Sequence, residues 1–142
     1  MSSTTNIYLD IDGVLLANDL NPANFAKEFI QHVLSKYPYS TYWLTTHCMG
    51  NPDPAIRHLA PYFDNATIGL LKKIKPTSWD MANKTKAIDF TKPFLWFDDD
   101  LFHDEEQALI DHGVLDNWIE VNLRKDENQL LKFIDSFPIP VR

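Results

Sequence analysis

The chain contains few of the residues that define several common classes of protein. It has one cysteine, Cys48, in 142 residues, so no intramolecular disulfide can form and a disulfide-stabilised domain is excluded. Its four glycines are too widely spaced for a GxGxxG dinucleotide loop or a GxxxxGK phosphate loop. If the protein handles phosphate, we expect it to do so without a glycine-rich loop.

Long apolar runs are absent as well. No run approaches the roughly 18 residues that a membrane helix needs. Residues 1–6 also lack the basic and apolar regions of a secretory signal. We therefore expect a cytoplasmic protein that makes no contact with a membrane.

Basic residues are outnumbered, with 13 Lys and Arg against 20 Asp and Glu, which gives a formal net charge of −7. An acidic surface repels phosphodiester backbones, so nucleic acid is not favoured as a general partner. The hydrophobic fraction of 44% and the charged fraction of 23% are close to the averages for globular proteins. At this length they predict one globular domain over residues 1–142.

Short apolar runs alternate with longer segments of helical period, which is typical of βα units around a parallel sheet. The predicted strands lie at about residues 6–10, 41–45, 66–68, 94–97 and 118–122. The first predicted helix begins near Pro22, and the others cover about residues 55–60, 84–90, 104–112 and 126–137. This order predicts an α/β fold with a doubly wound, mainly parallel sheet of five strands.

Acidic side chains follow two of the predicted strands, at the edge where ligands bind in open α/β sheets. Asp10 and Asp12 are separated by one residue, so both can face one ligand from an extended segment. Asp98 and Asp99 end a later strand. Several carboxylates in one place are costly without a divalent cation, and an oxygen-only ligand set suits Mg²⁺ better than zinc. No constellation of Cys and His residues competes with this set.

These motifs resemble those of the haloacid dehalogenase-like (HAD) superfamily of Mg²⁺-dependent phosphohydrolases. The DxDG motif of the family is similar to Asp10-Ile11-Asp12-Gly13, and its paired acids are similar to Asp98-Asp99, with Asp100 leaving the register open by one residue. The resemblance covers about residues 7–100, in the order of the family.

Two further positions fit the resemblance. The family places a Thr or Ser at the end of the second strand, which corresponds to Thr45, with Thr46 as the alternative. It also places a lysine before the strand with the paired acids, which corresponds to Lys84, with Lys86 as the alternative.

The resemblance implies a phosphatase that forms an aspartyl-phosphate. Asp10 would be the nucleophile, and Asp12 would protonate the leaving group and then activate water. Thr45 and Lys84 would hold the phosphoryl oxygens. A second Asp in the motif favours phosphoryl transfer over cleavage of carbon–halogen bonds.

The resemblance also implies a Mg²⁺ ligand set. It consists of Asp10, the backbone carbonyl of Asp12 and Asp98, with Asp99 as a candidate through water. No other cofactor is expected.

No separate cap domain is expected, because residues 13–44 and 46–83 are filled by the predicted elements. The site should be open to a phosphorylated small molecule or macromolecule. Two alternatives stay open: a binding or regulatory module with weak or no turnover, and a phosphatase that processes nucleic-acid ends. For the second, a local basic patch would come from Lys72, Lys73 and Lys75. The adjacent His47 and Cys48 should point apart, so no catalytic pair is predicted there.

Overall fold

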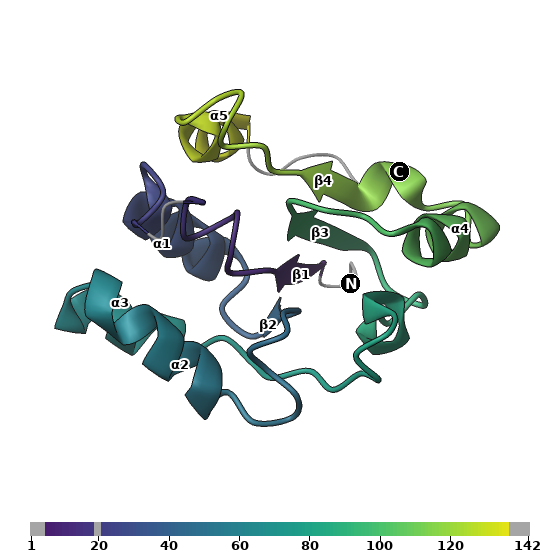
Figure 1. Ribbon diagram of the computed structural model, residues 1–142, viewed down its shortest axis with the longest axis horizontal. Helices are drawn as coiled ribbons and strands as arrows, with labels where there is room; N and C mark the ends of the chain where they lie inside the picture. Colours follow the sequence, from purple (N-terminus) through teal and green to yellow (C-terminus); the bar gives the residue numbers. More distant parts are fainter. Residues whose placement is uncertain (1–4, 19–20, 137–142) are drawn as a thin grey trace.

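The computed structural model describes residues 5–18 and 21–136. These residues form an α/β fold around a parallel sheet, as the sequence predicts (Figure 1). The strands are β1 (Asn6–Leu9), β2 (Thr41–Trp43), β3 (Phe94–Asp98) and β4 (Trp118–Glu120), in the order β2-β1-β3-β4. All neighbouring strands are parallel. Within the described residues the sheet has four strands, not the five that were expected.

Helices follow each of the strands. They are α1 (Ala26–Lys36), α2 (Asp53–Leu59), α3 (Asn65–Leu71), α4 (His103–Asp111) and α5 (Gln129–Ser136). Three short 3₁₀ helices are η1 (Ala60–Tyr62), η2 (Lys84–Ala87) and η3 (Leu115–Asn117). The predicted end of the last helix, residue 137, lies outside the described residues. Within the described ranges, no helix combines the length and the apolar character needed to cross a membrane.

The strand predicted at residues 66–68 is wrong, because these residues lie inside α3. Asp64 begins this helix, with its side chain accepting a hydrogen bond from the Thr67 N–H at 2.8 Å, and such a cap outweighs the β propensity of Thr67 and Ile68. The sheet edge beside β2 is instead contacted by Lys75, whose N–H donates to the Thr41 carbonyl. That isolated bridge replaces the fifth strand.

Alternating residues of the central strands face two apolar clusters. On one face, Ile7, Leu9 and Phe97 belong to the cluster that also contains buried residues of α1, α2, α3 and α5. On the other face, Tyr8 and Trp96 belong to the cluster that contains Leu109 of α4. Because the sheet is covered on both faces, its strands are apolar throughout, as is usual for parallel sheets.

The pairing of β1 with β3 brings two acidic residues to the same edge of the sheet. The chain passes from β1 to β2 on one side and returns across β1 to β3 on the other, so the strand order reverses between β1 and β3. Ligands of open α/β sheets bind at such a reversal. Leu9 pairs with Phe97, and the Asp10 N–H donates to the Phe97 carbonyl at 3.1 Å. Asp10 and Asp98 therefore reach the same edge of the sheet.

Candidate active site

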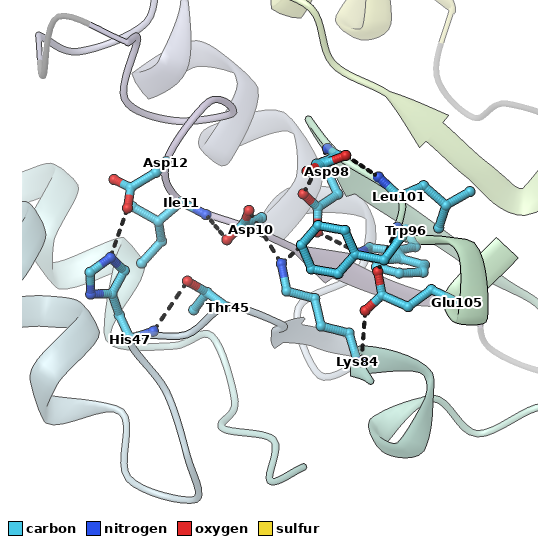
Figure 2. A network of polar contacts seen from close by, with 12 residues as sticks. Asp10, Ile11, Asp12, Thr45, His47, Lys84, Trp96, Asp98, Leu101 and Glu105 are labelled. Atoms are coloured by element: carbon cyan, nitrogen blue, oxygen red, sulfur yellow. Dashed lines mark hydrogen bonds and ion pairs between the residues drawn. The ribbon is translucent and has the colours of Figure 1, made fainter. Parts of the chain in front are cut away.

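Lys84 joins the two acidic residues at this edge (Figure 2). Its Nζ donates to Asp98 Oδ2 at 2.6 Å and lies 3.4 Å from Asp10 Oδ2. The Asp98 side chain is only 2% exposed and also accepts a hydrogen bond from Trp96 Nε1 at 3.2 Å. The Ile11 N–H donates to Asp10 Oδ1 at 2.8 Å. The sequence-predicted residues Asp10, Lys84 and Asp98 thus form one buried network.

The charges in this network are not balanced. Burial and the neighbouring Asp10 carboxylate raise the pKa of Asp98 to about 9, although the Lys84 ammonium group acts in the opposite direction. Burial also raises the pKa of Asp99. Burial disfavours the ammonium form of Lys84, yet the carboxylates of Asp10 and Asp98 outweigh it and raise the Lys84 pKa. One lysine cannot offset three ionised carboxylates, so a bound cation would favour the charged forms of Asp98 and Asp99.

The carboxylates also have the geometry of a cation site. Asp10, Asp98 and Asp99 each offer one oxygen, and these oxygens lie within 4.8 Å of one another. A set of oxygen donors with excess negative charge fits a hard divalent cation such as Mg²⁺. The side chain of Asp12 is not part of this group. The ligand that the resemblance implies for Asp12 is its backbone carbonyl.

Gly13 allows Asp99 to approach the loop that follows β1. Its φ is +83°, and a Cβ atom at this position would lie 2.2 Å from Asp99 Oδ2. Both facts require glycine, the first for backbone conformation and the second for space. The glycine of the DxDG motif therefore allows the third carboxylate to join the cluster.

We expect Gly13→Ala to lower both stability and affinity for divalent cations, because the new methyl group displaces Asp99. Gly113→Ala is the matched control, since Gly113 has a φ of +69° but no atom within 4 Å of an added Cβ. It should cost only about 1–2 kcal/mol for the left-handed backbone. The free energy of unfolding and the Mg²⁺ affinity of the two variants can be compared by denaturant titration and calorimetry. Equal Mg²⁺ affinity in both would contradict this role of Gly13.

Glu105 holds the lysine in place and was not predicted. Its Oε2 accepts a hydrogen bond from the Lys84 N–H at 2.9 Å, and its Oε1 accepts one from the Phe102 N–H at 3.1 Å. Glu105 is buried at the third position of α4, where a glutamate commonly caps a helix. The sequence could indicate Glu105 as a helix-capping residue from this position. It could not indicate the contact with Lys84, which depends on the tertiary fold.

The structure distinguishes between the alternatives for the lysine and the threonine. Lys84 lies in the carboxylate network, whereas Lys86 is exposed and makes no contact with it. Thr45 is fully buried, and its Oγ1 accepts a hydrogen bond from the His47 N–H at 3.3 Å. Thr46 is exposed and lines the cavity that contains Asp10 and Lys84. Lys84 is thus the better placed lysine, and Thr46 is the threonine at the cavity.

The carboxylate of Asp12 points to two histidines and away from this network. His47 Nε2 lies 2.8 Å from Asp12 Oδ2, and His58 Nε2 lies 2.9 Å from Asp12 Oδ1 (His47 and Asp12 in Figure 2). Burial opposes the charged form, but the hydrogen bonds to His47 and His58 lower the pKa of Asp12. The expectation that no constellation of Cys and His residues competes as a metal-ligand set is wrong, because Asp12, His47 and His58 form one. Because His58 is 46 positions from Asp12, no local motif indicates this cluster.

The cavity at the carboxylates has a volume of about 210 Å³ and a mixed lining. Asp10 and Lys84 supply charged groups to its lining, and Trp79, Met81 and Phe102 supply apolar side chains. Met81 and Phe102 are 58% and 61% exposed, so the apolar part of the cavity is accessible from solvent. Met81 also has a φ of +67°, a strained conformation of the kind found at functional sites.

The basic patch suggested by the sequence does not reach this cavity. Lys72, Lys73 and Lys75 are exposed, but they are not among the described residues that line it. Nothing in the geometry of the site therefore favours a nucleic-acid end over other phosphate esters.

Neither a family model, nor a curated protein, nor a solved structure matches this chain. Its function is therefore inferred from its own motifs and geometry.

Proposed function

We infer that this protein is a Mg²⁺-dependent phosphomonoesterase of the HAD-like type, with an aspartyl-phosphate intermediate and an open site without a cap. The single observation that supports this most strongly is the position of Asp10. Its carboxylate lies where the strand order reverses, beside Lys84 and within reach of two further acids. A nucleophile, a phosphate-binding cation and a metal ligand set are the parts that such a reaction needs.

In the first step, a carboxylate oxygen of Asp10 forms a bond to phosphorus and the ester oxygen departs. The Ile11 N–H fixes the orientation of the Asp10 carboxylate. Lys84 Nζ and the Thr46 or Thr45 hydroxyl hold the phosphoryl oxygens as charge develops. Asp10, Asp98 and Asp99, with the carbonyl of Asp12, would hold Mg²⁺, whose contribution is to neutralise charge between carboxylate and phosphate.

Proton transfer is assigned to Asp12. It gives a proton to the departing oxygen and then takes one from the water that attacks the aspartyl-phosphate, which restores Asp10 and releases phosphate. His47 and His58 contact both oxygens of the Asp12 carboxylate, so they set its orientation between these steps. Transfer requires the carboxyl group to turn from the histidines to the substrate, because their hydrogen bonds lower its pKa and only a carboxyl group released from them can hold the proton that the departing oxygen receives.

The rim of the cavity favours substrates with an apolar, planar leaving group. Met81 and Phe102 line the same cavity as Asp10 and Lys84, and both are more than half exposed. An aromatic group can stack on Phe102 and pack against Met81 while the phosphate reaches Lys84. Aryl phosphates, including phosphotyrosine in a peptide, should therefore be better substrates than small alkyl phosphates.

We expect Phe102→Ala to raise the KM for an aryl phosphate several-fold and to change the KM for an alkyl phosphate little, because stacking contributes about 0.5–1.5 kcal/mol. Ile110→Ala is the control, since Ile110 is a large apolar residue on α4 that is also about half exposed but is not among the residues that line the cavity. Steady-state kinetics with both substrates measures the effect. Equal losses with the two esters would show that Phe102 does not contact the leaving group.

The proposed activity is tested with an aryl phosphate in the presence of Mg²⁺, after removal of metal with a chelator, and after Mg²⁺ is added back. We expect hydrolysis only with Mg²⁺. Hydrolysis at the same rate in excess chelator would contradict the metal requirement.

The second candidate is a binding or regulatory module with the same fold and metal site. The observation in its favour is that the Asp12 carboxylate contacts two histidines and is not among the residues lining the cavity. Such a module would bind Mg²⁺ and leave every phosphomonoester intact. Calorimetry with Mg²⁺, run beside the hydrolysis assay, separates the two candidates.

A further inference from the structure

Asp12, His47 and His58 form a separate cluster of metal-ligand type. The residues come from three segments: the loop after β1, the loop after β2 and the last turn of α2. One ligand atom from each lies within 4.8 Å of the other two. The two imidazole rings are stacked, with centroids 3.9 Å apart and planes 16° apart, and each directs Nε2 to a different oxygen of the same carboxylate.

This ligand set differs in chemistry from the carboxylate site. Two imidazole nitrogens and one carboxylate oxygen suit a borderline transition metal, whereas three carboxylates suit a hard cation. Catalytic zinc sites commonly have three protein ligands of this kind and a water molecule in the fourth position. The side chains are 27% exposed for both histidines and 51% for Asp12, so an ion can enter and keep a water ligand.

We propose that Asp12, His47 and His58 constitute a second metal site, selective for a transition-metal cation of the Zn²⁺ class and distinct from the carboxylate site of Asp10, Asp98 and Asp99. The stacked histidines already share one carboxylate, so little rearrangement is needed to place a cation among the three side chains. The ion replaces the imidazole N–H donors as the partner of the Asp12 carboxylate, and each neutral imidazole binds it through Nε2 and carries its proton on Nδ1.

Occupation of this site has a consequence for Asp12. A carboxylate bound to Zn²⁺ is unable to turn to the substrate or to carry a proton, so Zn²⁺ should inhibit hydrolysis even when Mg²⁺ is saturating. This consequence depends on the proposed phosphatase function, whereas the existence of the site does not.

Binding is tested with Zn²⁺ alone, by calorimetry on the full chain in the presence of saturating Mg²⁺. We expect His47→Gln and His58→Gln to weaken Zn²⁺ binding by at least about 100-fold, because loss of even an outer-shell partner costs about 10–100-fold in metal affinity. Three matched controls should leave it unchanged: His103→Gln, an exposed histidine on α4; Asp99→Asn, in the carboxylate site; and Cys48→Ser, a buried thiol next to His47 that is not part of the proposed ligand set.

A second measurement uses the unaltered protein, in case a histidine variant fails to fold. Added Co²⁺ should broaden the imidazole resonances of His47 and His58 and leave those of His103 and His112 sharp. The proposal is overturned if both histidine variants bind Zn²⁺ like the wild type, if Asp99→Asn abolishes binding, or if Co²⁺ leaves His47 and His58 unaffected. If Zn²⁺ binds at the histidines but no phosphatase activity exists, the metal site stands and the proposed function fails.

Discussion

Asp10→Asn is expected to lower the rate of phosphate release by on the order of 10³-fold or more, because an amide oxygen is a poor nucleophile and the covalent route is then closed. Asparagine has nearly the same shape as aspartate. Its Oδ1 can still accept the hydrogen bond from the Ile11 N–H, so the loop after β1 should keep its conformation. The effect should therefore appear in kcat and not in the fold.

Stability separates this result from simple unfolding. Asp10 contributes to the repulsion that raises the pKa of Asp98, so its neutralisation should leave the Tm unchanged or raise it in the absence of Mg²⁺. Asp135→Asn, at an exposed position on α5, is the control and should retain full activity. Activity of Asp10→Asn within about ten-fold of the wild type would remove Asp10 as the nucleophile.

Lys84→Gln is expected to lower the free energy of unfolding by about 3 kcal/mol in the absence of divalent cations, because the buried carboxyl groups of Asp10 and Asp98 lose the ammonium group that pairs with both of them. The side chains of Lys84 and Asp98 are 13% and 2% exposed, and their contact is 2.6 Å long. Glutamine can keep a hydrogen bond to one carboxylate but supplies no charge. Chemical denaturation with and without Mg²⁺ measures the effect.

Added Mg²⁺ should restore much of that stability, since a bound ligand at 100 times its Kd contributes about 2.7 kcal/mol. Activity should stay low, because the phosphoryl oxygens have lost their cation. Lys86→Gln, two residues away and exposed, should change the stability by less than about 0.5 kcal/mol. Equal effects of the two substitutions would show that Lys84 is a surface charge like its neighbour.

The sequence predicted the site residues that directly follow an expected strand. Asp10 and Asp98 follow apolar runs, and because parallel strands end at one edge of the sheet, their proximity follows from the pattern alone. Lys84 was predicted from the family resemblance, and its ion pairs with Asp10 and Asp98 depend on where η2 packs. Thr45 and Thr46 are adjacent, and the sequence does not show that Thr45 is buried while Thr46 lines the cavity.

The sequence could not predict the parts that depend on packing between distant segments. The contact of His58 with Asp12 spans 46 positions and requires α2 to pack against the end of β1. The link from Glu105 to Lys84 requires α4 to lie beside η2. The expected strand at residues 66–68 failed for a local reason, because the Asp64 cap stabilises a helix where residue propensity favours a strand.

The covalent intermediate on Asp10 is the central claim, and acid quenching during turnover tests it most directly. The protein is mixed with Mg²⁺ and an aryl phosphate that carries a radiolabelled phosphoryl group, quenched in acid, reduced with borohydride and mapped by peptide mass spectrometry. We predict label on the quenched wild type, none on Asp10→Asn, and reduction of the phosphorylated carboxyl group at Asp10 to an alcohol. Mg²⁺-dependent turnover with label on another residue, or with no trapped label and an unmodified Asp10, would contradict the account.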